Sequence, residues 1–287
     1  MNHLILQEIV RGALIEDIQH GDITSEAIFP ENFQITGTFT AEEPGVIAGF
    51  PVVAEIYRQL DSEIQCTCLI PDGNMVNPGA KIIEIAGPVK PILAGERVAL
   101  NFLRRLSGIA SQTARMVLLA TGSHAKIVDT RKTTPGLRML EKYAVRQGGG
   151  INHRYNLADA VLIKDNHIAA CGSIAEAVKR ARQYIPHTMT IEVETENEAQ
   201  VLEAVNAGAD IILLDNMSPH EMARMVKLIQ THQGDRKILI EASGNVAESN
   251  VHEVAMSGVD IISCGAITHS VKAMDISLHF ENVNDGK

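Results

Sequence analysis

The sequence predicts an α/β protein with an antiparallel first part and a parallel α/β barrel, complete or short of a strand or two, as its second part. Between residues 34 and 89, short β-like runs are broken by turn residues, a pattern typical of antiparallel sheets with a helix or two. After residue 95, short apolar runs alternate with helical patterns, as they do in parallel βα units. The two halves of the chain therefore differ in architecture.

A long amphipathic helix is expected within "GERVALNFLRRLSGIASQTARMVLLA", where Val98, Phe102, Arg105 and Ile109 recur on one side. The strands expected after this helix are "KIVDT", "AVLIKD", "TIEVET", "IILLDN", "ILIEAS" and "IISCGA". The chain contains neither a G-x-G-x-x-G nor a G-x-x-x-x-G-K-[ST] element, which argues against a dinucleotide enzyme or a P-loop ATPase.

Composition excludes several classes of partner. The chain has 287 residues, 45% of them hydrophobic, and a formal net charge of -10, so it can bury a core but repels phosphate polymers and anionic membranes. It contains no signal-peptide core and no apolar run of the roughly 18 residues that a membrane helix needs. Its four cysteines lack a C-x-x-C pair and are expected to be reduced structural thiols. A cytoplasmic protein without nucleic-acid or membrane partners is predicted.

A basic segment stands out against this acidic background. From Arg131 to Lys164 the chain has seven Arg or Lys residues against two acids, Glu141 and Asp159. A local excess of this size in an acidic chain indicates a site for a small anion. Within "TTPGLRMLEKYAVRQGGG" a helix is expected, capped by Thr134 and ended by the glycines, and its N-terminus would add backbone N–H donors for the anion.

The basic residues divide into two groups. Arg138, Lys142 and Arg146 fit a solvated helix face. Side chains at strand ends and Gly-rich turns instead favour anion binding, because arginine forks match carboxylates and lysines supply point charges; these are Arg131, Lys132, Arg154 and Lys164. His153, which follows three glycines, is a candidate ligand contact, with a structural role as the alternative.

Acidic residues are also expected at the strand ends. Glu192, Glu194, Asp215 and Glu241 fall there, and alternation places Glu192 and Glu194 on one face of their strand. Carboxylates gathered at one rim repel each other unless cations or hydroxyl donors separate them. This combination suits a phosphorylated sugar with Mg²⁺, whereas Glu192 and Glu241 could instead pair with buried basic groups.

Several of these motifs together resemble one family. "DTRKTTPGLRMLEKYAVRQGGGINHR", "DAVLIKDNHI", "IEVE", "LLDN", "EASGN" and "GAITHS" occur in this order. They are similar to the motifs of nicotinate-nucleotide pyrophosphorylase (carboxylating), or quinolinate phosphoribosyltransferase. The resemblance runs from "GDIT" through "ERVALNFLRRLSGIA" to "THSVKAMDISL", over nearly the whole chain.

The resemblance implies an N-terminal α/β sandwich domain, residues 1–106 plus 270–287, and an incomplete parallel α/β barrel, residues 107–269. It also implies the reaction of quinolinate with phosphoribosyl pyrophosphate and Mg²⁺, which gives nicotinate mononucleotide, pyrophosphate and CO₂. The family forms homodimers, and larger assemblies remain open. The active site is shared across the subunits.

The resemblance also assigns roles to residues. The quinolinate carboxylates would be held by Arg131, His153, Arg154 and Lys164, with Arg97 supplied by the neighbouring subunit. Lys132, Glu194 and Asp215 would serve as catalytic residues that bind phosphoribosyl pyrophosphate, and the two carboxylates would hold Mg²⁺ directly or through water. The 5'-phosphate would be bound by Ser243, Gly244, Asn245, Gly265 and His269.

Three alternatives stay open at this point. One is a ModD-like phosphoribosyltransferase paralogue, associated with molybdenum transport. A second uses Lys164 as the Schiff-base lysine of a barrel aldolase. The third, from outside the enzymes, is an inactive barrel that only binds a metabolite.

Overall fold

A computed structural model describes residues 1–31 and 33–280 of the chain, which divides into two units. Unit 1 consists of Met1–Ala114, Thr134–Gly149 and the described residues from Val271, and unit 2 of Arg115–Thr133 and Gly150–Ser270. Compared with the predicted N-terminal domain, unit 1 also contains residues 107–114 and 134–149. The predicted domain further includes residues 32 and 281–287, which lie outside the described residues.

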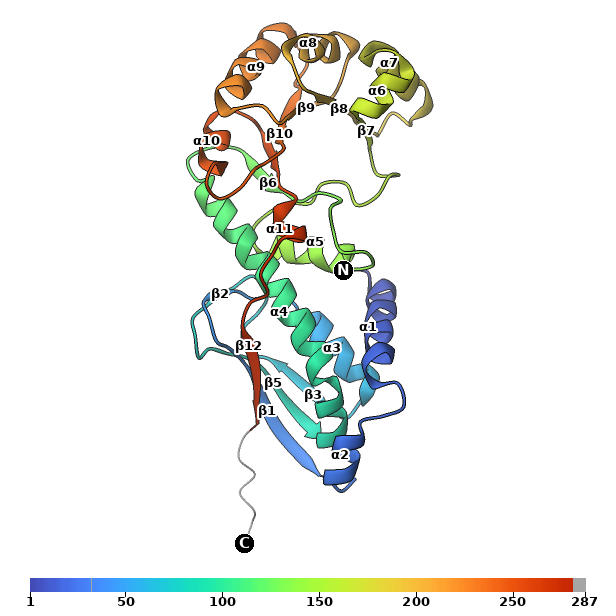
Figure 1. The fold of residues 1–287 in the computed structure, drawn as a ribbon, viewed down its shortest axis with the longest axis vertical. Helices are drawn as coiled ribbons and strands as arrows, with labels where there is room; N and C mark the ends of the chain where they lie inside the picture. The colour runs from blue at the N-terminus through green and yellow to red at the C-terminus, as the bar shows by residue number, and fades with distance from the viewer. Residues whose placement is uncertain (32, 281–287) are drawn as a thin grey trace. The chain divides into compact units, whose positions relative to one another are not determined.

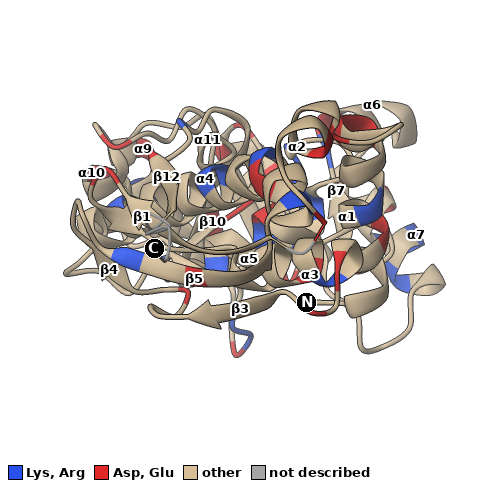
Figure 2. Cartoon of the chain, turned by 90° about the horizontal axis from the view of Figure 1, so that it is seen from below, with Lys and Arg blue, Asp and Glu red and all other residues tan. Residues whose placement is uncertain are grey.

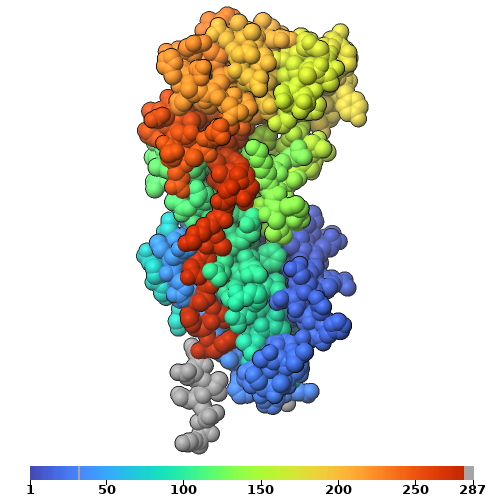
Figure 3. Space-filling model, in the orientation of Figure 1, coloured from blue at the N-terminus to red at the C-terminus, as the bar shows by residue number. Residues whose placement is uncertain are grey.

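Unit 1 is built on an antiparallel sheet of four strands in the order β12-β1-β5-β3 (Figure 1). The strands are β1 (Gln34–Ala41), β3 (Gln65–Cys68), β5 (Lys81–Pro88) and β12 (Ile276–Phe280), and β2 (Gly45–Val46) pairs separately with β4 (Met75–Val76). Antiparallel structure over residues 34 to 89, as predicted from the sequence, is confirmed. The C-terminal strand pairs with β1, so the red C-terminal atoms lie against N-terminal residues of this unit in Figure 3.

Helices complete unit 1. They are α1 (His3–Ile18), α2 (Ile23–Ile28), α3 (Phe50–Leu60), α4 (Val89–Leu119) and α5 (Arg138–Gln147), of which α4 ends in unit 2. Of the residues predicted to share one side of α4, Val98 and Ile109 are buried, whereas Phe102 and Arg105 are half-buried. Leu103 and Leu106, beside this line, are buried too. Fully buried Phe39 of β1 and Tyr57 of α3 place the core between sheet and helices, and their rings are 6.5 Å apart.

Unit 2 contains the six predicted strands, all parallel, in the order β6-β11-β10-β9-β8-β7. They are β6 (Lys126–Val128), β7 (Val161–Ile163), β8 (Ile191–Thr195), β9 (Ile211–Asp215), β10 (Leu239–Ser243) and β11 (Ile261–Ser263). Helices α7 (Ile174–Tyr184), α8 (Glu198–Ala207) and α9 (Pro219–His232) cover the outer side of the curved sheet (Figure 1). The shorter α6 (Asp165–Cys171), α10 (Val251–Met256) and α11 (Ala266–His269) complete the unit.

The helix starts of unit 2 follow from local sequence. Ser173, Asn197 and Ser218 each accept a backbone N–H of the first turn of α7, α8 and α9. Gly208 ends α8 with a positive φ of 84°, a conformation that glycine adopts without a steric penalty. Strand, capped helix and glycine therefore repeat as βα units, which confirms the predicted parallel α/β architecture.

The barrel is incomplete, because β6 and β7 are not paired with each other within the described residues. Instead Ile151 forms a single parallel bridge with Val128 at the end of β6. The chain from Gly150 to Arg154 therefore runs along the open side of the barrel. This segment includes His153, whose side chain enters the pocket described below.

Helix α5 differs from its prediction at the N-terminus. It begins at Arg138, and Thr134 does not cap it. Gly136 has a φ of 80°, which a helical residue cannot adopt, and Thr134 instead donates its backbone N–H to Glu141. The helix ends at Gln147 before the glycines, as predicted.

The predicted solvated face of α5 is wrong for Lys142, which is fully buried, whereas Arg146 is exposed and Arg138 half-buried. The neighbouring Glu141 is fully buried too and accepts from Arg105 at 2.6 and 2.9 Å. The helix therefore lies inside unit 1, where charged side chains are retained because opposite charges meet.

No helix within residues 1–31 and 33–280 combines the length and apolar character needed to cross a membrane. Basic and acidic residues are interspersed along many elements (Figure 2).

Two glycines of unit 1 should respond oppositely to substitution by alanine. A Cβ at Gly148 would lie 2.3 Å from the carbonyl oxygen of Ala110, whereas a Cβ at Gly12, within α1, would have no neighbour within 4 Å. We expect Gly148→Ala to lower the free energy of unfolding by about 1 to 3 kcal/mol because the packing cannot accept the methyl group. We expect Gly12→Ala to raise it by about 0.5 to 1 kcal/mol through the better helix propensity of alanine. Urea denaturation measures both, and equal effects would contradict the prediction.

Candidate active site

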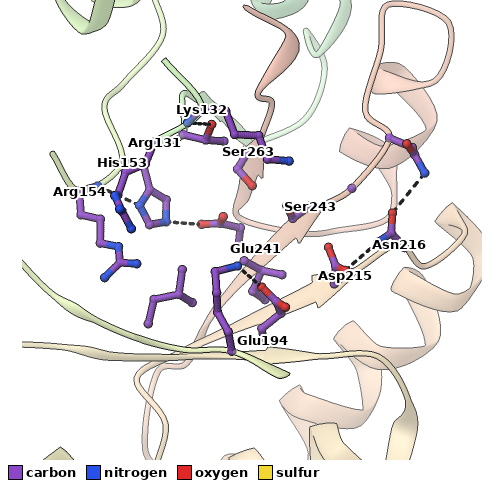
Figure 4. A pocket seen from close by; sticks show the side chains of 16 residues that line it. Arg131, Lys132, His153, Arg154, Glu194, Asp215, Asn216, Glu241, Ser243 and Ser263 are labelled. Atoms are coloured by element: carbon purple, nitrogen blue, oxygen red, sulfur yellow. Dashed lines mark hydrogen bonds and ion pairs between the residues drawn. The ribbon is translucent and has the colours of Figure 1, made fainter. Parts of the chain in front are cut away.

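A cavity of unit 2 lies at the carboxyl ends of the barrel strands and has a volume of about 500 Å³ (Figure 4). Strands β9 and β10 contribute alternate residues to it, Leu213 with Asp215 and Glu241 with Ser243, since successive side chains point to opposite faces. The lining comprises Thr130, Arg131, Lys132, His153, Arg154, Leu162, Lys164, Glu194, Leu213, Asp215, Asn216, Glu241, Ser243, Gly244, Asn245 and Ser263. Ligands of parallel α/β folds bind at this end of the strands, so the cavity is the candidate active site.

The structure brings together ten of the thirteen site residues predicted from the sequence. These are Arg131, Lys132, His153, Arg154, Lys164, Glu194, Asp215, Ser243, Gly244 and Asn245. Gly265 and His269 do not line the cavity but lie beside Lys132, since a Cβ at Gly265 would be 3.0 Å from Lys132 Cδ and 3.1 Å from His269 Cδ2. Arg97 is exposed on α4, in unit 1.

The sequence did not single out six lining residues as site residues. Four of them, Thr130, Leu162, Leu213 and Ser263, lack a charge and gave no signal beyond their places at the strand ends. Glu241 was considered among the strand-end acids. Asn216 follows Asp215 and has a φ of 54°, an uncommon value for a residue other than glycine, which places its side chain beside Gly244.

Two arginines face the cavity from neighbouring loops. Burial and the nearby positive charge of Arg131 lower the pKa of Arg154, because the two guanidinium groups lie close enough to repel each other. The Arg154 guanidinium also donates to the carbonyl oxygen of Ala160 at 3.0 Å, which orients it from one side. Two like charges at one cavity favour an anionic ligand.

Lys132 is positioned through its backbone. Its carbonyl oxygen accepts from the Thr268 hydroxyl at 2.8 Å, and its N–H donates to Thr130 Oγ1 at 3.0 Å. The side chain itself is exposed and reaches the cavity. Its ammonium group is therefore available to a ligand at the rim.

An ion pair crosses the cavity. Lys164 follows β7, Glu194 lies near the end of β8, and their Nζ and Oε2 atoms are 2.6 Å apart. The Glu194 side chain is 13% exposed and that of Lys164 45%, so this pair is only partly screened by solvent. Asp215, on the neighbouring strand β9, accepts from the Asn216 side-chain amide at 2.7 Å. Both carboxylates face the same cavity.

His153 lies between two buried carboxylates. Its Nε2 is 3.2 Å from Glu192 and 3.5 Å from Glu241, and its Nδ1 accepts the Arg154 backbone N–H at 2.8 Å. Burial lowers the pKa of His153, but hydrogen bonds and attraction from the two carboxylates more than offset this and raise it to about 10. A second proton, on Nδ1, would nevertheless face the Arg154 N–H, so the observed contact is that of the neutral ring with its proton on Nε2.

This cluster bears on metal binding. His153, Glu192 and Glu241 offer ligand atoms within 4.8 Å of one another. An Nε2 that carries a proton has no lone pair for a metal, however, because Nδ1 is already the acceptor. The pairing of Glu192 and Glu241 with a basic group, one of the two roles considered from the sequence, is thus found. Glu194 and Asp215 fit a hard cation better, since their carboxylate oxygens face the cavity.

The turn after β10 completes the site. Gly244 has a φ of 89°, and a Cβ there would lie 2.2 Å from Asn216 Oδ1. Asn245 also has a positive φ, 51°, and donates its side-chain amide to Asn216 Oδ1 at 3.2 Å. Ser243, Gly244 and Asn245 therefore form a tight turn whose backbone approaches the cavity closely.

A second cavity, of about 510 Å³, lies in unit 1 between α1, α4 and residues 134–137. Glu8, Glu16 and Asp17 make its rim acidic, and it contains none of the thirteen predicted site residues. An anion-binding site therefore belongs in unit 2.

A parallel α/β barrel with cations and carboxylates at its strand ends is typical of enzymes that act on anionic small molecules. Comparison with known proteins specifies the family. The model described as "Quinolinate phosphoribosyl transferase, C-terminal domain" matches residues 109–279, and that described as "Quinolinate phosphoribosyl transferase, N-terminal domain" matches residues 22–107. The chain therefore belongs to the quinolinate phosphoribosyltransferase family.

Individual relatives agree with this assignment. The chain is 47% identical to the probable nicotinate-nucleotide pyrophosphorylase [carboxylating] of Bacillus subtilis over 97% of this chain and 94% of that protein. It is 43% identical to the protein of the same name from Synechocystis, over 96% and 92% of the two chains. The solved nicotinate-nucleotide pyrophosphorylase of Francisella tularensis superposes with a TM-score of 0.92 at 40% identity, over 98% of both chains.

Anion binding by the cavity can be measured with inorganic pyrophosphate as the probe. We expect Lys132→Ala to weaken pyrophosphate binding by about 10- to 150-fold, since a charge-assisted hydrogen bond contributes about 1.5 to 3 kcal/mol. Lys227→Ala is the matched control, because it removes the same charge from an exposed position of α9. Isothermal titration calorimetry at fixed salt gives both affinities. Equal weakening by the two variants would assign the binding to net charge alone.

Proposed function

We propose that this chain transfers the phosphoribosyl group of phosphoribosyl pyrophosphate to quinolinate and releases pyrophosphate and CO₂, giving nicotinate mononucleotide. This is a reaction of de novo NAD biosynthesis. The observation that carries the proposal is one cavity of unit 2 that holds both the basic residues and the carboxylates, in a chain whose relatives are named for this reaction. Basic residues alone would not hold Mg²⁺, and carboxylates alone would repel the two anionic substrates.

Quinolinate is a dianion, and three cations of the cavity are proposed to hold it. Arg131 and Arg154 provide planar forks for its carboxylates, and Lys164 a point charge. Arg97, exposed on α4, is proposed to reach the active site of a neighbouring subunit, which makes a homodimer the proposed assembly. His153 stays a predicted substrate contact, although both of its ring nitrogens already have protein partners.

Phosphoribosyl pyrophosphate is proposed to bind along the strand ends opposite these cations. Lys132 would contact the diphosphate, and the turn formed by Ser243, Gly244 and Asn245 the 5'-phosphate. Gly265 and His269 lie beside Lys132 and are proposed to support the same phosphate. Glu194 and Asp215 would hold Mg²⁺, directly or through water. The bound ion would supply positive charge to the departing pyrophosphate.

The chemistry follows from these positions. The pyridine nitrogen forms a bond to the anomeric carbon as the bond to the diphosphate oxygen breaks. Lys132 stabilises the charge that develops on the departing pyrophosphate, and Glu194 and Asp215 stabilise the oxocarbenium-like ribosyl group. The ring nitrogen is then cationic, so the bond between C2 and its carboxylate breaks readily, and C2 takes up a proton as CO₂ leaves.

The aldolase alternative is less well supported. Schiff-base formation requires a neutral amine, whereas the ion pair of 2.6 Å between Lys164 and Glu194 involves the ammonium form.

A turnover assay tests the proposed function. Quinolinate and nicotinate are compared, each with phosphoribosyl pyrophosphate and Mg²⁺, while CO₂ and pyrophosphate are followed. Release of both products with quinolinate is expected. Preference for nicotinate would assign the chain to another activity, and binding without turnover to the inactive metabolite-binding barrel.

Removal of one arginine fork should weaken the reaction specifically. We expect Arg131→Ala to lower kcat/KM for quinolinate by about 10- to 150-fold, because a charged hydrogen bond contributes about 1.5 to 3 kcal/mol. Arg146→Ala, at an exposed position of α5, should leave kcat/KM within about twofold. Steady-state kinetics measure both, and full turnover by Arg131→Ala would remove this residue from the proposed site.

The ion pair between Lys164 and Glu194 should couple the two substrates. The proposal assigns Lys164 to quinolinate and Glu194 to the metal and diphosphate, so each ligand competes with this pair and, once bound, releases the residue that the other needs. We expect Glu194→Gln to bind quinolinate about fivefold or more tightly than the unaltered protein, because Lys164 is released. Isothermal titration calorimetry without phosphoribosyl pyrophosphate measures this gain.

Asp215→Asn is the control for this prediction. It removes the same charge from the same cavity but leaves the partner of Lys164 in place. An equal gain in both variants would show a general charge effect and contradict the coupling.

A further inference from the structure

Glu192 and Glu241 are two buried carboxylates that the proposed chemistry does not use. They lie on β8 and β10, on either side of β9, and their side chains are 4% and 2% exposed. Glu241 reaches the cavity wall, whereas Glu192 lies deeper in the barrel, since Glu194 is the residue of β8 that lines the cavity. Both approach one group, the Nε2 of His153, which comes from the open side of the barrel. Figure 4 shows the contact with Glu241.

The imidazole ring has protein contacts at both ends. Its Nε2–H donates to the two carboxylates, and its Nδ1 accepts the Arg154 backbone N–H at 2.8 Å. The backbone N–H of His153 donates to the buried Asp129 at 2.9 Å. The ring thus links β8 and β10 to the chain segment that carries Arg154.

Burial of these two carboxylates lowers the stability of the fold. Within the described residues, the Oε1 atoms of Glu192 and Glu241 are buried and have no hydrogen-bond partner. Apolar residues of similar volume are often neutral or stabilising when they replace buried charged groups. Stability alone therefore does not explain two glutamates at these positions, whereas a requirement for acceptors of the His153 proton does.

The segment held by this cluster is the one that lacks support from a sheet. β6 and β7 are not paired within the described residues, and Ile151 makes only one bridge to β6. Arg154 follows three residues later and lines the cavity. Its guanidinium donates to the Ala160 carbonyl oxygen, and its backbone N–H donates to His153. The contacts of His153 therefore hold this segment in place where hydrogen bonds between paired strands would otherwise do so.

We propose that Glu192 and Glu241 are positioning residues, which hold His153 as the Nε2–H tautomer and thereby fix Arg154 for the carboxylate of the substrate. The proposal rests on the proposed function for the identity of that substrate. Neither glutamate is proposed to contact quinolinate; they act on it through the position of Arg154, in addition to the contact predicted for His153.

Two double variants test the role of the acceptors. Glu192→Gln with Glu241→Gln keeps an oxygen acceptor for Nε2–H at both sites, whereas Glu192→Leu with Glu241→Leu removes both acceptors at similar volume. We expect the leucine pair to raise KM for quinolinate about tenfold or more, with KM for phosphoribosyl pyrophosphate and kcat changed less than about threefold. We expect the glutamine pair to stay within about threefold of the unaltered protein in all three.

The thermal midpoint separates positioning from folding. Because buried charge is removed, the leucine pair should unfold at the same or a higher temperature than the unaltered protein. Ile240→Val is the control, since Ile240 is a buried neighbour of Glu241 on β10 whose side chain alternates to the other face. It should lower the midpoint and leave KM for quinolinate unchanged.

The ring of His153 gives a readout that does not depend on activity. In ¹⁵N-histidine spectra of the full chain, we expect the Nε2–H tautomer in the unaltered protein and in the glutamine pair, and loss of this fixed tautomer in the Glu192→Leu single variant. If the double leucine variant does not fold, the spectrum of the Glu192→Leu variant tests the proposal in its place.

Three results would overturn the proposal: an Nδ1–H tautomer in the unaltered protein, an unchanged KM in the leucine pair, or an equal rise of KM for both substrates. Failure of the proposed function is distinguishable. In that case the unaltered protein does not turn over quinolinate, while the His153 spectrum still tests whether the glutamates fix the ring.

Discussion

The organisation of unit 2 depends on the neutralisation of carboxylates that parallel strands bring to one end of a barrel. Glu194 and Asp215 lie on neighbouring strands and face one cavity, and Glu192 and Glu241 lie inside the barrel. Carboxylates at such short range and low exposure repel each other strongly. Lys164 pairs with Glu194, and the Nε2–H of His153 donates to Glu192 and Glu241, so these two residues serve the barrel as well as its ligand.

Much of the fold could be predicted from local pattern. The six strands of unit 2 were all identified because fully buried parallel strands form short apolar runs that end in charged or small residues. The site was also accessible, since strand-end positions such as Lys164, Glu194 and Asp215 converge in any parallel barrel. Assignment to quinolinate and phosphoribosyl pyrophosphate rested on the family motifs, because charge alone fits many anions.

Other features depend on tertiary contacts that no local pattern encodes. Lys142 has the spacing of a solvated face, yet it is buried, because α5 packs inside unit 1. The sequence predicts Thr134 as a helix cap, but its backbone N–H donates to the Glu141 side chain, and the chain turns at Gly136 before the helix begins. The pairing of His153 with Glu192 and Glu241 joins three separate chain segments. The sequence therefore left open whether His153 contacts a ligand or is structural, and whether the two glutamates bind a metal or pair with a basic group.

The pairing of β12 with β1 has a consequence for biosynthesis. Residues 34–41 leave the ribosome well before their antiparallel partner, Ile276–Phe280, because all six strands of unit 2 lie between them in the sequence. Until then β1 presents an unpaired sheet edge, the kind of surface on which chains aggregate. Nascent chains therefore expose this edge until unit 2 and β12 have been synthesised, and a truncation that removes β12 would leave the edge exposed permanently.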